Sequence, residues 1–81
     1  MKIITHKMRD NTHWHSLVEY DEQGRIISAV EPVNEDGSID ENNSQVTFWE
    51  FDYSASAIYS RHCGNGEGCF WTDWELCGGK E

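Results

Sequence analysis

The chain has 81 residues, of which 37% are hydrophobic and 12% aromatic, and its 15 acidic residues against 6 Lys and Arg give a net charge of -9. A chain of this length buries only a small core, which argues against a two-domain enzyme with its own cofactor cleft. The aromatic content argues against intrinsic disorder, in which aromatic residues are scarce. We therefore expect residues 1–81 to fold as one small acidic domain.

A β-hairpin is the first element that the sequence predicts. Residues His13–Tyr20 are rich in aromatic and β-branched side chains and predict a strand whose even-numbered positions form an inward face. Gly24 supplies a positive φ angle in the tight connection Asp21–Arg25, and Ile26–Val33 is the returning strand. Pro32 cannot donate a hydrogen bond within a sheet, so it either places the end of this strand at a sheet edge or terminates the strand.

An acidic loop and a further strand follow the hairpin. Residues Asn34–Ser44 contain an Asp-Gly turn and a single apolar residue, so we expect them to form a mobile loop. Residues Gln45–Tyr53 are dense in β-forming side chains and predict a strand. Ser54 is a candidate N-cap for a short helical turn that includes Tyr59, but a short extended segment fits these residues equally well.

The last third of the chain predicts a glycine-rich turn and a final strand. Three glycines in Cys63–Cys69 require a turn or loop, and Phe70–Leu76 alternates as a strand does. Residues 78–81 are expected to form a flexible tail. The predicted fold is mainly β: a small antiparallel sheet of four to five strands in meander order. The alternative is an α+β fold, in which one short helix crosses a face of this sheet.

The three cysteines leave three interpretations open. An odd number cannot form a closed set of intramolecular disulfides, and a cytoplasmic location disfavours disulfides, so free thiols acting as small apolar groups are the first interpretation. Together with His62, residues Cys63, Cys69 and Cys77 would supply four donors for a tetrahedral zinc ion, although their spacing is wider than that of most structural zinc sites. A Cys63–Cys69 disulfide in an oxidising environment is the third interpretation.

A histidine pair is the other candidate metal site. His13 and His15 flank Trp14, so on a strand both imidazoles project from one face about 6 to 7 Å apart. They would need a third ligand from elsewhere, such as Glu19 or His62. The sequence contains no nucleophile motif, phosphate-binding loop or paired-carboxylate signature, so we expect no enzymatic activity.

The negative charge is concentrated in the middle of the chain, where residues 31–60 hold seven acidic residues and no Lys or Arg. A net charge of this sign repels nucleic acid and anionic membranes and attracts basic proteins. Carboxylates in rows about 6 to 7 Å apart on strand faces could imitate phosphates, with large aromatic residues as anchors. The predicted partner-binding residues are Asp36, Asp40, Glu41, Trp49, Glu50, Asp52, Tyr53, Trp71, Asp73 and Glu75. The alternative is that the acidic residues only keep the domain soluble and that the tryptophans form its core.

In size, charge and lack of catalytic motifs, the chain resembles small acidic proteins of phages and mobile elements that inhibit host or defence machinery, such as anti-CRISPR and anti-restriction proteins. The resemblance implies a non-enzymatic inhibitor that docks by charge mimicry on a basic protein or nucleoprotein complex that handles nucleic acid. The net charge disfavours direct binding to nucleic acid and membranes, and we expect no cofactor other than the possible zinc ion.

The competing hypothesis is a small zinc-stabilised structural or adaptor domain that uses Cys63, Cys69, Cys77 and a histidine.

The sequence has no apolar run of the roughly 20 residues that a membrane-spanning helix needs. Its first residues, Met1–Lys7, lack the apolar stretch of a secretory signal. We therefore expect a cytoplasmic protein, in the host bacterial cytoplasm if a phage encodes it.

Overall fold

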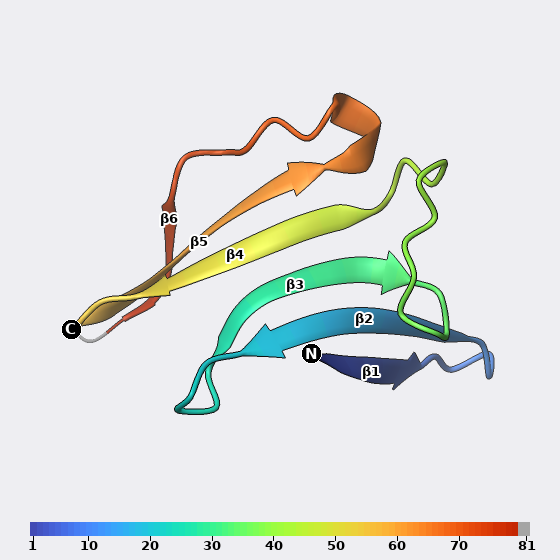
Figure 1. Cartoon of the computed structure of the whole chain (residues 1–81), viewed down its shortest axis with the longest axis horizontal. Helices are drawn as coiled ribbons and strands as arrows, with labels where there is room; N and C mark the ends of the chain where they lie inside the picture. The colour runs from blue at the N-terminus through green and yellow to red at the C-terminus, as the bar shows by residue number, and fades with distance from the viewer. Residues whose placement is uncertain (80–81) are drawn as a thin grey trace.

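The strands form an antiparallel sheet in chain order. The computed structural model describes residues 1–79, which contain six strands and one 3-10 turn. Each strand pairs antiparallel with the next along the chain (Figure 1). The predicted mainly β meander is confirmed, with slightly more strands than the expected four to five. The elements are β1 (Lys2–Lys7), β2 (His13–Tyr20), β3 (Ile26–Val33), β4 (Thr47–Tyr53), β5 (Ala57–Gly64), η1 (Asn65–Glu67) and β6 (Glu75–Gly79).

The predicted hairpin is confirmed at both strands. Its turn forms because the Asp21 carboxylate accepts hydrogen bonds from the backbone N–H groups of Gln23 and Arg25, each at 2.9 Å. Gly24 adopts the predicted positive φ angle, 80°. Pro32 does not terminate β3, which continues to Val33 and pairs there with His15 of β2. On the other side of β3, the pairing with β4 ends at Glu31, just before the proline, which has no N–H to donate.

Three elements differ from what the sequence predicted. β1 was not predicted, because only two adjacent isoleucines interrupt its polar sequence. The helical turn proposed after Ser54 is wrong: Ala57–Gly64 forms β5, so the extended alternative holds. The strand predicted over Phe70–Leu76 is present only from Glu75, and residues 78 and 79, expected in the tail, belong to β6. The rest of that tail lies outside the described residues.

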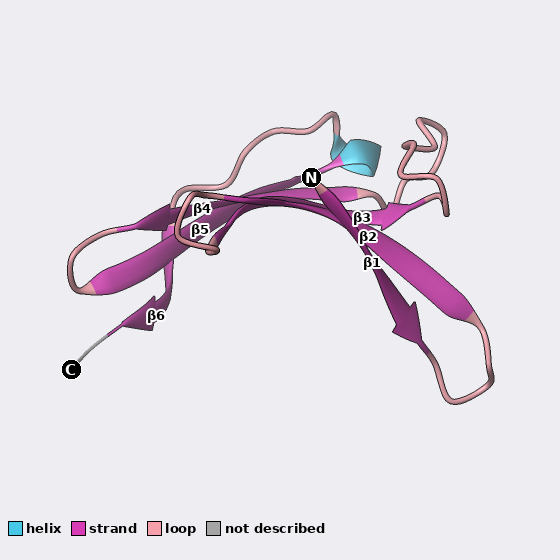
Figure 2. Cartoon of the chain, turned by 60° about the horizontal axis from the view of Figure 1, so that its bottom comes forward, coloured by secondary structure: helices cyan, strands magenta, loops and turns pink. Residues whose placement is uncertain are grey.

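The sheet is bent into an arch, with the β3–β4 loop and η1 on its outer side (Figure 2). We call this outer side the convex face; Val30, Phe48 and Cys63 lie on it, paired across neighbouring strands. The loop rests on this face, because a Cβ atom added to Gly37 would lie 3.1 Å from the Ile3 side chain and 3.8 Å from that of Leu17.

The opposite, concave face carries much of the aromatic packing. Ala29, Trp49 and His62 pair across three neighbouring strands on this face. The ring centre of Trp49 lies 4.6 Å from that of His62, and the His6 and Trp14 rings stack with centres 3.9 Å apart. Two small residues on this face, Ser16 and Ser60, are buried. The concave side therefore acts as part of the core, although no second layer covers it within the described chain.

A buried serine joins three strands on the concave face. Ser16 is 3% exposed, and its hydroxyl donates to a Glu31 carboxylate oxygen at 3.0 Å. The His6 Nε2 atom lies 3.0 Å from the same hydroxyl oxygen. Because a hydroxyl has one proton, Ser16 donates to Glu31 and accepts from His6, which fixes the Nε2–H tautomer of that imidazole. The network therefore links β1, β2 and β3.

We expect the Ser16→Ala substitution to lower the free energy of unfolding by about 1–2 kcal/mol, because it leaves Glu31 and His6 without their common partner. Urea denaturation followed by circular dichroism measures this change. The matched control is Ser28→Ala, which removes a comparable cross-strand bond to Glu19, 3.1 Å long, at a less buried position. Equal losses in the two variants would contradict a special role for the Ser16 network.

Candidate protein-interaction surface

The predicted partner-binding residues divide between the two faces of the sheet. Glu50 and Asp52 lie on the convex face, in register with Arg61 and Tyr59. Trp49 alternates with them along β4 and therefore points to the concave face. Tyr53 also alternates with Asp52, and its hydroxyl donates to the Ile26 carbonyl. These two aromatic side chains do not join the acidic ones in one surface.

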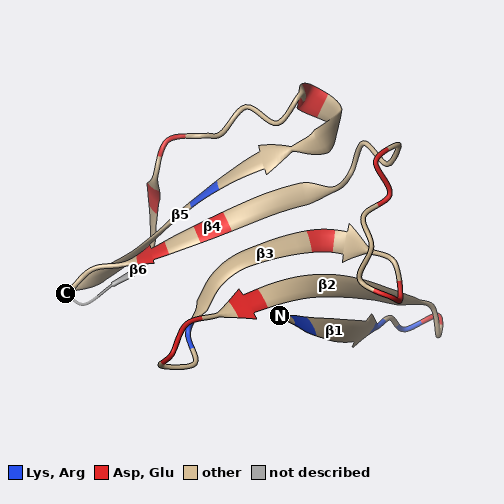
Figure 3. Ribbon diagram, in the orientation of Figure 1, with Lys and Arg blue, Asp and Glu red and all other residues tan. Residues whose placement is uncertain are grey.

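The acidic loop lies on the convex side of the sheet (Figure 2), the side to which the strand register assigns Glu50 and Asp52. Figure 3 shows the acidic residues of the chain in red. Within the loop, the Asp36 carboxylate accepts hydrogen bonds from the Ser38 hydroxyl at 2.6 Å and from the Ser38 backbone N–H at 2.9 Å. These bonds, the hydroxyl bond foremost, hold the pKa of Asp36 below its usual value, so the carboxylate is ionised at neutral pH. The loop therefore presents negative charge on the convex side.

The acidic loop packs against the η1 turn. The Asn65 side-chain amide donates to the carbonyl oxygens of Glu41 and Asn43, each at 3.0 Å. A Cβ atom at Gly66 would lie 2.8 Å from the Ser44 carbonyl oxygen, so only glycine permits this approach. These contacts fix the end of the loop beside β5, and the predicted mobility of residues 34–44 stays a prediction.

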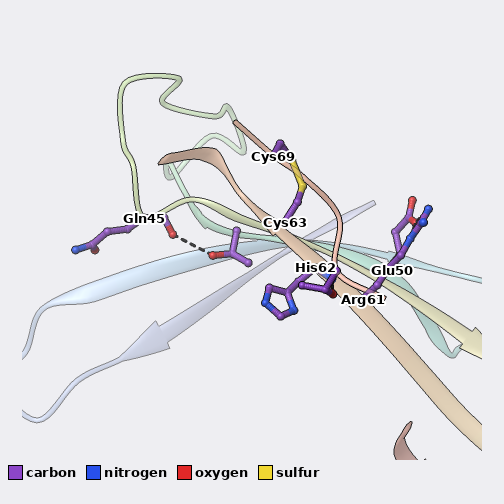
Figure 4. Close-up of a disulfide and its surroundings, with 8 residues drawn as sticks. Gln45, Glu50, Arg61, His62, Cys63 and Cys69 are labelled. Carbon is purple, nitrogen blue, oxygen red and sulfur yellow. Dashed lines mark hydrogen bonds and ion pairs between the residues drawn. A yellow bond between two sulfur atoms is a disulfide. The ribbon is translucent and has the colours of Figure 1, made fainter. Parts of the chain in front are cut away.

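A disulfide joins the end of β5 to the segment after η1. Cys63 is 1% exposed and is bonded to Cys69, with the two Cα atoms 4.6 Å apart (Figure 4). The structure therefore agrees with the third interpretation of the cysteines, a Cys63–Cys69 disulfide. The free-thiol interpretation is wrong for these two residues. Cys77 is exposed and free, and its thiol lies 3.4 Å from the Ile58 carbonyl oxygen.

The candidate zinc ligands are not brought together. The disulfide leaves neither Cys63 nor Cys69 as a thiolate, the form that binds zinc. His62 points to the concave face, away from the disulfide (Figure 4). His15 lies on the convex face, with its Nδ1 atom 3.1 Å from the Thr5 hydroxyl, so His62 cannot complete the histidine pair. Within residues 1–79, no group of three His, Cys, Asp or Glu side chains is placed to hold a metal ion.

Arg61 organises the surface beside the disulfide. Its guanidinium group binds a Glu50 carboxylate oxygen, with Nε–O and Nη2–O distances of 2.7 and 2.6 Å. The same group lies over two indole rings, 4.7 Å from the centre of Trp71 and 4.9 Å from that of Trp74. Glu50 is thus already neutralised within the chain. The sequence-based list of partner-binding residues included neither Arg61 nor Trp74. The signal that could have indicated Arg61 is its position directly after residues 31–60, which contain no Lys or Arg.

The segment after the disulfide exposes large apolar side chains. Phe70 is 81% exposed, Leu76 64%, Trp74 43% and Trp71 39%; we call these four residues the aromatic strip. Thr72 anchors the segment to the edge of β5: its N–H donates to the His62 carbonyl at 2.9 Å, and its hydroxyl accepts from the His62 N–H at 3.1 Å. The strip is therefore held at a fixed place beside the sheet.

The comparisons with known proteins provide no relative. No protein-family model, curated protein or solved structure matches the chain. In the part of the chain that the structure describes, no helix is long and apolar enough to cross a membrane.

Proposed function

We propose that this protein is a non-enzymatic acidic binding protein that inhibits a nucleic-acid-handling protein by occupying its basic surface. Anti-CRISPR and anti-restriction proteins of phages and mobile elements act in this way. The partner is a basic protein or nucleoprotein complex. The protein itself binds neither nucleic acid nor membrane and uses no cofactor.

The observation that carries this proposal is a group of exposed, unpaired carboxylates on the convex side of the sheet. Asp40, Glu41 and Asp52 are exposed. Among residues 1–79, none of these three carboxylates takes part in an ion pair, whereas Glu50 does. Unpaired charges of one sign on one side of a small domain attract a basic partner and raise the association rate. A surface that served only solubility would not require this concentration in residues 31–60.

The test is a charge variant that removes three acidic groups, Asp40→Asn, Glu41→Gln and Asp52→Asn. Glu50 is left intact because it holds Arg61, and Asp36 because it accepts two hydrogen bonds from Ser38. Asp40 accepts one turn bond, from the Asn42 N–H, and the amide oxygen that Asp40→Asn introduces can still accept it. We expect at least about a tenfold loss of binding, which corresponds to about 1.4 kcal/mol. The partner is captured from a bacterial lysate at low salt, identified, and then measured against each variant at increasing salt.

The matched control removes the same number of charges from two hairpin turns elsewhere, through Asp10→Asn, Asp21→Asn and Glu22→Gln. It should stay folded, since amide oxygens still accept the turn hydrogen bonds of Asp10 and Asp21, and loss of the partly exposed Asp21–Arg25 ion pair costs little. It should bind as the unaltered protein does, because its three charges lie outside residues 31–60. A DNA oligonucleotide should also displace the protein from its partner. Equal binding by both variants, or no competition by DNA, would overturn the proposal.

A further inference from the structure

The aromatic strip is unusual in the amount of apolar surface that it exposes within a short stretch of chain. Four large side chains within residues 70–76 are exposed, whereas Met8, Tyr20 and Ile39 are exposed at separate places. Leu76 pairs in register with Tyr59, itself 36% exposed, which extends the apolar surface onto β5. Exposed apolar side chains gathered in one segment mark interaction sites in soluble proteins, whereas single exposed residues do not.

The strip is held in place before any partner binds. The Cys63–Cys69 disulfide fixes its beginning, and both hydrogen bonds of Thr72 to His62 tie it to the edge of β5. Arg61 lies against the rings of Trp71 and Trp74. A rigid aromatic surface loses little conformational entropy on binding, so more of the contact energy appears as affinity.

The charges around the strip indicate the chemistry of its partner. Asp73 and Glu75 alternate with strip residues along the chain, and Asp52 is in register with Tyr59 beside it. Arg61, the basic residue in contact with the strip, is already paired with Glu50. The surroundings are therefore negative and favour a cationic ligand. A second copy of the chain is disfavoured as the occupant, because each copy carries a net charge of -9 and would bring the same acidic groups to the contact.

The contact with Arg61 indicates which cation fits. A guanidinium group is planar and weakly hydrated, so it stacks on indole rings better than the compact, strongly hydrated ammonium group of lysine. The Arg61 guanidinium lies over the two indoles, and Trp71 and Trp74 both remain about two-fifths exposed. The exposed parts of Trp71 and Trp74 can accept a second guanidinium from outside.

We propose that the aromatic strip is the docking site for an arginine-bearing segment of the basic partner. The partner's guanidinium groups stack on the exposed surfaces of Trp71 and Trp74, and its aliphatic side chains pack on Phe70 and Leu76. This inference rests on the proposed function for the identity of the partner, but the recognition chemistry belongs to the strip itself and can be measured without that partner.

The test is an NMR titration of the isotope-labelled full chain with a short peptide of repeating Arg-Leu-Gly. The chain supplies its own control, because Trp14 and Trp49 lie on the concave face and Trp71 and Trp74 in the strip. Single Trp→Phe variants assign the four indole N–H signals. We expect the signals of Trp71 and Trp74 to shift with saturation while those of Trp14 and Trp49 stay in place. Equal shifts of all four signals, or no shift, would overturn the proposal.

Two further comparisons test the chemistry. A Lys-Leu-Gly peptide should bind at least about threefold more weakly, because lysine lacks the stacking geometry of arginine. The double variant Phe70→Ser with Leu76→Ser should weaken binding of the arginine peptide about tenfold, as loss of two central contacts does. The matched control is Met8→Ser with Ile39→Ser, which removes exposed aliphatic side chains elsewhere and should leave binding unchanged. Equal affinities for the two peptides, or equal losses in the two variants, would overturn the proposal.

The outcome is separable from that of the proposed function. If the strip binds the arginine peptide but the charge variants capture the same proteins as the unaltered chain, the inhibitor proposal falls and the strip remains an arginine-binding surface. If the charge variants lose their partner while the peptide leaves Trp71 and Trp74 unaffected, the docking site is wrong and the inhibitor proposal stands.

Discussion

Replacing Trp49 by alanine is expected to unfold most of the domain, although the sequence pattern alone suggests Trp49 as a binding anchor. The indole lies on the concave face between the rings of His62 and Phe51, whose centres are 4.6 and 6.5 Å away. Truncating a packed tryptophan costs about 3 kcal/mol or more. A single core of this size rarely supplies more than about 3–5 kcal/mol. Far-UV circular dichroism and urea denaturation would show the loss.

The matched control for this prediction is Trp74→Ala. Its ring is 43% exposed and contacts the Arg61 guanidinium, so we expect a loss of only about 1 kcal/mol and a folded protein. If Trp49→Ala stayed as stable as Trp74→Ala, the concave face would not be part of the core, and Trp49 would again be available as an anchor.

Removing the disulfide through Cys63→Ala and Cys69→Ala is the second change with a large expected effect. The bond closes a short loop with a sequence separation of 6. Chain entropy in the unfolded state then predicts a loss of about 2 kcal/mol. For a domain of this size, the melting temperature should fall by roughly 10 °C. A thermal melt with and without dithiothreitol provides the measurement, and the reduced protein should match the double variant.

The control for the disulfide prediction is Cys77→Ala, which removes the free, exposed thiol and should leave the melting temperature nearly unchanged. An unaltered melt after reduction of Cys63–Cys69 would mean that the 65–75 segment is held by its hydrogen bonds to β5 and not by the covalent link. In that case the effect of the alanine pair would reflect only the lost packing of the buried Cys63 side chain.

The sequence best predicts those strands in which the alternation of apolar and polar residues along the chain matches their burial in the sheet. In β2, Ser16 and Val18 are buried as the pattern predicts, whereas Tyr20, on the same predicted inward face, is 38% exposed at the end of the strand. β1 has no such pattern, because it is an outer strand and pairs only with β2 among the described strands. The Phe70–Leu76 alternation is misleading, because only Thr72 reaches the edge of β5 before β6 begins.

The candidate surface was predictable only in part. The concentration of acidic residues in 31–60 is a property of the sequence itself, and the structure places the loop acids on the convex side with Asp52. The pairing of Glu50 with Arg61 depends on the β4–β5 register, which the turn between these strands sets. Trp49 and Glu50 are adjacent on a strand and therefore face opposite ways, so the alternation rule already separated them.

The order of the strands also determines how the chain can fold. Because each described strand pairs with its neighbour in sequence, the sheet can grow one hairpin at a time, without the entropy cost of closing long loops. The longest connection between paired strands is 34–46, the acidic segment between β3 and β4. The sheet therefore divides at this point into two halves, β1–β3 and β4–β6, each held together by shorter connections. Joining β3 to β4 therefore carries the largest loop-closure entropy in the described sheet, and it completes the arch only when the acidic loop has closed.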